Sequence, residues 1–186
     1  VADTMERVFD VANRTRTNVE ATATLYYRLQ RSMAHTGITG QELARVTETI
    51  NKAMIVSGAT AHETSAALLQ FSQGMASGVL RGDEFRSVAE QAPRLTQIIA
   101  NHLGLTIGKL REFAYAGKLT ADVVMEALSG AANTIDQEFN RTIPTFDQNL
   151  TIAKNNLIKF MGESSKTQGA VRTLGDALVG LSTNLD

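Results

Sequence analysis

Apolar residues recur through most of the chain at alternating steps of three and four residues, the spacing that places them on one face of an α-helix. At the N-terminal end this spacing predicts one long helix within residues 1–36. Its face is made of Met5, Val8, Ala12, Thr15, Val19, Thr22, Tyr26, Leu29 and Met33. Thr15 and Thr22 interrupt the apolar stripe and charged residues flank it, so we expect this helix to pack on a partner over only part of its length.

Two further apolar series predict helices at the other end of the chain. The first consists of Phe146, Leu150, Ala153, Leu157 and Phe160, and the second consists of Val171, Leu174, Leu178, Leu181 and Leu185. A helix that exposes such a stripe gains little stability alone, so each must pack on something. We expect the terminal helices to fold back on the core or on each other, with at most weak self-association. The alternative is a coiled coil between chains.

Between these helices, a repeated three-part signal divides the chain into short helices. A glycine suited to the left-handed end of a helix is followed by an apolar residue and by a threonine that can cap the next helix. The signal occurs at Gly37-Ile38-Thr39, Gly104-Leu105-Thr106 and Gly117-Lys118-Leu119-Thr120. The spacings Thr39–Glu42 and Thr60–Glu63 are those of capping boxes, which supports helix starts after both threonines.

No stretch alternates between apolar and polar residues for long enough to predict a strand, and the chain has only two prolines. The predicted fold class is therefore all-α: a bundle of short helices with a helix-turn-helix-like unit of three helices, flanked by longer helices at both ends. We divide the chain into a long N-terminal helix at 1–36, a compact helical core at 37–143, and C-terminal helices at 144–186 that lead toward an extended rod.

Composition narrows the classes of protein to which the chain can belong. It has 186 residues, of which 43% are hydrophobic, a formal net charge of -1 and no cysteine. Near-neutral charge argues against wrapping nucleic acid, since that affinity comes mainly from Lys and Arg. The absence of cysteine removes disulfides and thiolate metal sites, and no apolar run is long enough for a membrane segment. Because the chain begins at Val1, we expect it to be a piece of a longer polypeptide.

A search for catalytic or ligand-binding patterns finds only partial matches. His62-Glu63 begins like a zinc-protease helix, but Ala66 stands where the second histidine ligand would be. Gly117-Lys118-Leu119-Thr120 lacks the rest of a phosphate-binding loop and is better explained as a helix end. The three histidines, His35, His62 and His102, fall on different predicted helices. We therefore predict no catalytic, cofactor-binding or metal-binding residues, and no enzyme.

One pattern leaves a second function open. Apolar and small residues from Ile99 to Phe113, with Gly104 at the turn, fit a helix-turn-helix. A DNA-binding regulator would use the second helix, Thr106–Phe113, and would present Lys109 and Arg111 to the phosphates. Ile107 and Gly108 read bases poorly and Glu112 repels phosphate, so a packing unit of three helices explains the pattern better.

The order of several short motifs resembles a segment of the tape measure proteins of long-tailed phages and prophages. The motifs are Leu80-Arg81-Gly82-Asp83-Glu84, Glu90-Gln91-Ala92-Pro93, Leu103-Gly104-Leu105-Thr106, Lys109-Leu110-Arg111, Gly117-Lys118-Leu119-Thr120 and Val124. Together with Phe139, Pro144-Thr145 and the helix that follows, the resemblance covers roughly Ala67–Met161. Each motif alone is weak, and the ordered series is the more specific signal.

The resemblance implies a structural role and no catalytic residues. It implies a phage tail component that helps set tail length and assembles with tail tube, tail chaperone and tail tip proteins, first in the host cytoplasm and then in the virion tail. No cofactor is implied, and from this region we expect neither specific nucleic acid binding nor a membrane segment. The alternative is the DNA-binding regulator with its helix-turn-helix at Thr106–Phe113.

Overall fold

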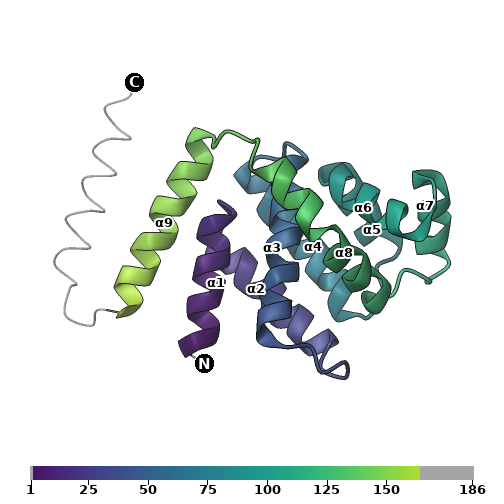
Figure 1. Ribbon diagram of the computed structural model, residues 1–186, viewed down its shortest axis with the longest axis horizontal. Coiled ribbons are helices and arrows are strands. Elements are labelled where there is room, and N and C mark those ends of the chain that lie inside the picture. Colours follow the sequence, from purple (N-terminus) through teal and green to yellow (C-terminus); the bar gives the residue numbers. More distant parts are fainter. Residues whose placement is uncertain (1, 164–186) are drawn as a thin grey trace.

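Helices fill most of residues 2–163, the part of the chain that the computed structural model describes (Figure 1). Within that range there are nine helices and no strand, which confirms the predicted all-α class. They are α1 (Ala2–Arg14), α2 (Val19–Ser32), α3 (Gly40–Val56), α4 (Ala61–Ala76), α5 (Gly82–Gln91), α6 (Pro93–Leu103), α7 (Ile107–Tyr115), α8 (Ala121–Phe139) and α9 (Phe146–Glu163). The predicted helix at Val171–Leu185 lies outside the described residues.

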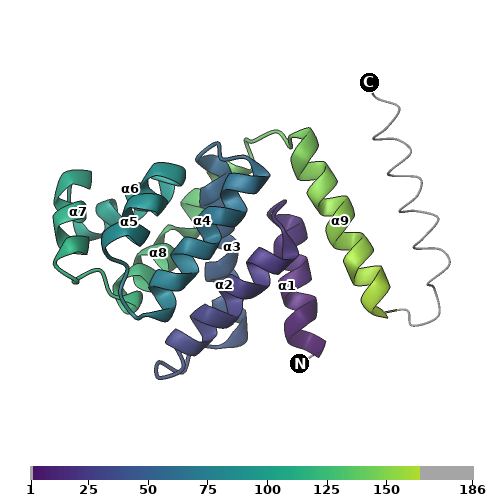
Figure 2. The same cartoon turned by 180° about the vertical axis from the view of Figure 1, so that it is seen from behind.

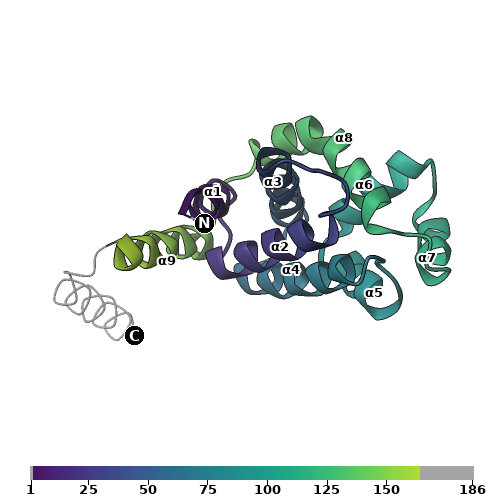
Figure 3. The ribbon, with the colours of Figure 1, turned by 90° about the horizontal axis from the view of Figure 1, so that it is seen from below.

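The long helix predicted within residues 1–36 is wrong, because the chain turns between α1 and α2. Arg16 adopts a left-handed φ of 57°, and the Asn18 side chain caps α2 by accepting a hydrogen bond from the Ala21 amide at 2.9 Å. Figure 3 shows α1 nearly end-on while α2 runs across the view. The two helices therefore point in different directions.

Buried hydroxyl groups explain this break. In one straight helix, Thr15 and Thr22 would bring hydroxyls into an apolar stripe, where an unpaired hydroxyl is costly. The turn instead brings Thr15, Thr17 and Thr22, all buried, around Asn51 of α3. The Asn51 Nδ2 lies 3.1, 2.9 and 3.1 Å from the three Oγ1 atoms. The polar positions in the apolar stripe thus form a hydrogen-bonded cluster.

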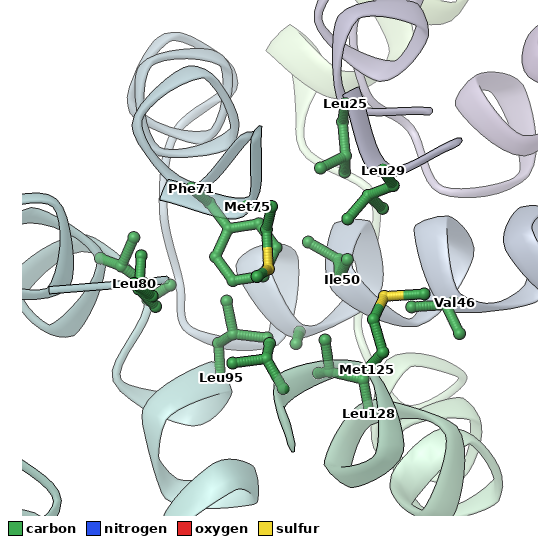
Figure 4. Packing of buried hydrophobic residues seen from close by; sticks show 14 of the residues in the cluster. Leu25, Leu29, Val46, Ile50, Phe71, Met75, Leu80, Leu95, Met125 and Leu128 are labelled. Carbon is green, nitrogen blue, oxygen red and sulfur yellow. The ribbon is translucent and has the colours of Figure 1, made fainter. Parts of the chain in front are cut away.

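The apolar core is centred on α3, which contacts α1, α2, α4, α6 and α8. Figure 4 shows its side chains converging from α2, α3, α4, α6 and α8. The labelled residues are Leu25, Leu29, Val46, Ile50, Phe71, Met75, Leu80, Leu95, Met125 and Leu128. Val8 of α1 is buried in the same cluster, so the N-terminal helices contribute to the core formed by residues 37–143. The division into three regions stays a prediction.

The helix ends in the middle of the chain follow the predicted signals. Gly37, Gly104 and Gly117 have left-handed φ angles of 71°, 64° and 70°. Thr39, Thr60, Thr106 and Thr120 cap α3, α4, α7 and α8 with their side chains, and both predicted capping boxes are present. These boundaries are confirmed because each depends on residues only a few positions apart.

Helices α5, α6 and α7 contact one another in pairs and form one end of the molecule (Figures 1 and 2). Pro93 is the first residue of α6, where its missing amide hydrogen costs nothing. The Leu80 amide donates to the Leu119 carbonyl at 2.9 Å, which ties the segment before α5 to the segment before α8. The turn at Gly104 is as predicted, whereas the helix-turn-helix-like arrangement of this unit stays a prediction.

Candidate functional site

A cluster of charged side chains joins α1, α3 and α8. Lys52 Nζ lies 2.6 Å from Glu48 Oε1 and 2.7 Å from Asp136 Oδ1. Arg45 contacts Asp136 at 2.5 Å, and Arg14 of α1 contacts Glu48 at 3.2 Å. Burial opposes the charge of Asp136, but hydrogen bonds from Arg45 and Lys52 outweigh it and hold the pKa of Asp136 below its usual value. These charges are paired with one another, which is the pattern of a structural network.

A groove of about 670 Å³ lies beside this cluster, between α1 and the first half of α3. It is lined by Arg7, Asp10, Val11, Arg14, Gln41, Glu42, Ala44, Arg45 and Glu48. Both signs of charge are present, and several of these groups already have partners: Glu42 in the cap of α3 and Arg14 with Glu48. The groove therefore has no excess of one charge that would select a charged ligand.

Helix α9 is attached to the body of the molecule through side-chain amides. Asn155 is fully buried, and its Nδ2 donates to the Thr17 carbonyl at 2.7 Å and to Asn13 Oδ1 at 3.2 Å. Its Oδ1 accepts from the Val19 amide at 3.0 Å. Next to it, the side-chain amide of Asn13 donates a hydrogen bond from Nδ2 to Asn156 Oδ1 at 2.8 Å. We call these contacts the amide junction. It binds α9 to the turn between α1 and α2.

The opposite face of α9 is apolar and exposed. Phe146 is 78% exposed and Leu150 is 48% exposed, while Phe160 and Met161 are also exposed. In α9 the buried residues are Gln148 and Asn155. The predicted stripe from Phe146 to Phe160 therefore does not face the core: α9 folds back on α1 and α4, as expected for a terminal helix, but with its other side.

The amide junction is the part of this region that the sequence did not reveal. Apolar periodicity assigned α9 an apolar inner face, whereas Asn155 and Gln148 face inward. One signal was present: Asn155 and Asn156 stand together inside a helical series, where asparagine is an unfavourable residue. Such a residue indicates a hydrogen-bonding role, but its partner, 138 positions away in the chain, is not visible in a local pattern.

The three histidines lie beside different helices and do not form a common site. His35 lies 3.5 Å from Asp122 and His102 lies 3.9 Å from Glu126, and His62 is in the first turn of α4. Among residues 2–163, no group of three His, Cys, Asp or Glu side chains is placed to hold a metal ion. Over the same range, no helix is both long and apolar enough to cross a membrane.

The surface of α7 presents little that could read DNA. Lys109, Arg111 and Glu112 are exposed, but Lys109 Nζ lies 2.8 Å from Glu112 Oε2. That hydrogen bond raises the pKa of Lys109 above its usual value. The lysine charge is thus opposed locally by a carboxylate, which weakens its attraction for a phosphate.

Comparison with known proteins identifies a family. A family model described as "Tape measure protein" matches residues 1–166. The match includes α1, α2 and α9, and so extends well beyond the Ala67–Met161 segment on which the resemblance rests. Neither the curated proteins nor the solved structures give a match to the chain.

Proposed function

The chain belongs to the tape measure protein family, and we propose that residues 2–163 form a folded module that helps set tail length. Members of this family are structural components of phage tails, so the chain has a structural role in a phage tail. The single observation that carries the proposal is the family match over residues 1–166, which takes in every described helix.

The proposal includes the partners and the place of assembly. The module would contact tail tube, tail chaperone and tail tip proteins in the host cytoplasm and would then remain in the virion tail. Two features are consistent with this role. The charged cluster and the amide junction use polar groups to join helices, and large apolar side chains on α9 are exposed, as is common at protein-binding surfaces.

Tail length tests the proposal. In the phage or prophage that encodes the chain, an in-frame deletion of codons 2–163 should shorten the tail by up to about 240 Å, if each residue contributes as extended helix at about 1.5 Å. Electron microscopy of released tails measures the change. Lys109→Ala serves as a control that should leave length unchanged. Tails of normal length from the deletion would contradict a length-setting role for this region.

The second candidate function is a DNA-binding regulator, which the turn at Gly104 and the cap at Thr106 favour. The Lys109–Glu112 pair and the net charge of -1 oppose it. We expect duplex DNA to bind no tighter than about 10⁻⁴ M at physiological salt. Submicromolar, sequence-dependent binding in a fluorescence anisotropy titration, lost in Lys109→Ala, would establish the regulator instead.

A further inference from the structure

Helix α1 lies between α9 on one side and α2 and α3 on the other (Figures 1 and 2). We propose that α9 is a clamp on α1, so that release of α9 also releases α1 from the body formed by α2 to α8. The position of α9 then decides whether the apolar surface under α1 is covered. The inference does not depend on the proposed function, because it concerns contacts within the chain.

The polar attachment of α1 to α9 centres on Asn13. Its Oδ1 accepts a hydrogen bond from Asn155 Nδ2 at 3.2 Å, and its Nδ2 donates to Asn156 Oδ1 at 2.8 Å. Asn155 also binds the backbone just beyond α1, at the Thr17 carbonyl and the Val19 amide. Release of α9 therefore removes contacts from the end of α1 and from the turn that follows it at the same time.

The attachment of α1 to α3 is incomplete. The groove of about 670 Å³ lies between them, and its α1 side is lined by Arg7, Asp10, Val11 and Arg14. Arg14 reaches Glu48 of α3 at 3.2 Å, but the Arg14 side chain is 61% exposed, and exposed ion pairs add little to stability. A helix of 13 residues is marginal alone. Helix α1 therefore depends on packing from α9 as well as from the body.

The apolar contact of α1 with the body uses another face of the helix. Met5 Sδ lies 3.2 Å from the Tyr27 hydroxyl of α2, and Thr15, just after α1, contacts Asn51 of α3. Val8 stands between Met5 and Thr15 at helical spacing and is fully buried. Exposure of Val8 therefore reports the departure of α1 from the body, as distinct from the departure of α9 alone.

The joint between α1 and α2 has the conformation of a strained hinge. Among the non-glycine residues of 2–163, only Arg16 has a left-handed φ, at 57°. This conformation is unfavourable for a residue with a Cβ and persists where neighbouring contacts impose it. One such contact joins Arg16 Nη1 to Thr142 Oγ1 at 2.9 Å. Beyond the hinge, Thr17 and Thr22 are bonded to Asn51, so α1 can swing about Arg16 while α2 stays in place.

Single cysteines in the full chain test the coupling, because the sequence has none. The reporters are Val8→Cys in α1, Ile158→Cys in α9 and Ala67→Cys in α4, and the measurement is the rate at which each thiol reacts with a maleimide. Asn155→Asp releases α9, because it buries a carboxylate where an amide donates to a backbone carbonyl. Asn149→Asp, at an exposed position of the same helix, is the matched control.

Relative to the control, we expect Asn155→Asp to raise the labelling rate at least tenfold at both Ile158→Cys and Val8→Cys, and to leave Ala67→Cys unchanged. A faster rate at Ile158→Cys alone would overturn the proposal, because α9 would then leave without α1. An equal rise at Ala67→Cys would also overturn it, since the whole chain would be unfolding. So would unchanged rates at all three positions, which would show that the amide junction does not hold α9.

A matched pair of variants at Arg16 tests the hinge with the amide junction intact. Arg16→Gly and Arg16→Ala both remove the guanidinium, but glycine adopts a left-handed φ freely and alanine does not. Helix α1 should therefore open more often in Arg16→Ala. We expect Val8→Cys to be labelled at least threefold faster in that variant than in Arg16→Gly. Equal rates would show that the backbone at Arg16 does not bias the position of α1, and the proposal would fail.

Discussion

At the scale of single residues, Asn51 is the most informative buried side chain. Its Nδ2 reaches the hydroxyls of Thr15 and Thr17 in the turn after α1 and of Thr22 in α2. Its Oδ1 is buried and has no hydrogen-bond partner among the described residues. The three hydrogen bonds from Asn51 Nδ2 therefore fix the position of the break between α1 and α2.

Replacing Asn51 should therefore destabilise the fold. We expect Asn51→Ala to lower the free energy of unfolding by about 1–3 kcal/mol, because buried hydroxyls lose their donor and a cavity forms. Urea unfolding followed by circular dichroism measures the change. Asn149→Ala on the exposed side of α9 is the control and should change stability by less than about 0.5 kcal/mol. Equal effects at the two sites would show that the polar cluster does not hold the turn.

Asp136 should make stability depend on pH. Its pKa is lower in the folded protein than the ordinary 3.8, so its stabilising contribution is fully present above about pH 5 and is lost as pH falls through the folded pKa. We expect Asp136→Asn to cost about 1–3 kcal/mol at pH 7 and less near pH 3. Asp83→Asn, at an exposed pair with Arg86, should cost under about 0.5 kcal/mol. A loss at Asp136 that stayed constant with pH would contradict this account.

At the scale of helices, Gly74 controls how closely α4 approaches the segment before α5. A Cβ at this position would lie 2.5 Å from Leu80 Cδ1 and 3.5 Å from Leu80 Cα, and Leu80 is fully buried. We expect Gly74→Ala to destabilise by about 1–3 kcal/mol through overpacking. Gly130→Ala in α8, with nothing within 4 Å, should instead stabilise by about 0.5–1 kcal/mol. Thermal melts of both variants test the opposite signs.

The same scale shows which parts of the fold were predictable from sequence. The end of α6 at Gly104 and the start of α7 after Thr106 depend on neighbours, so local signals were sufficient. The break at Thr15–Asn18 depends on Asn51, 36 residues from Thr15, and a pattern that treats threonine as a weak stripe residue predicts a continuous helix. Apolar spacing does not predict the inward face of α9 for the same reason, since the partners of Asn155 are distant in the sequence.

At the scale of the whole molecule, the described helices form a body with α7 at one end and α9 at the other (Figures 1 and 2). The family match supplies the structural role, which no arrangement of side chains in residues 2–163 could have identified alone. What could be predicted of the candidate site was its apolar stripe. Its orientation could not be predicted, because either side of α9 could have faced the core.

Sedimentation of the full chain tests how the molecule behaves in solution. We expect a monomer at micromolar concentration, because Val19, which belongs to the apolar stripe predicted within residues 1–36, is buried in the core of the same chain. A stable dimer or trimer that dissociates in Phe146→Asp would contradict this expectation. Phe146 is a suitable probe because its exposure allows substitution without disturbing the core.

The amide junction has a consequence for how α9 separates from the body. Separation of α9 breaks hydrogen bonds such as the one from Asn155 Nδ2 to the Thr17 carbonyl and uncovers Ile158, which packs against the core. This is only part of the surface that global unfolding exposes, and the dependence of an opening reaction on denaturant scales with the surface exposed. Detachment of α9 would therefore be a local fluctuation with little sensitivity to urea, separate from global unfolding. The Val19 amide, which donates to Asn155, would exchange its hydrogen by that route.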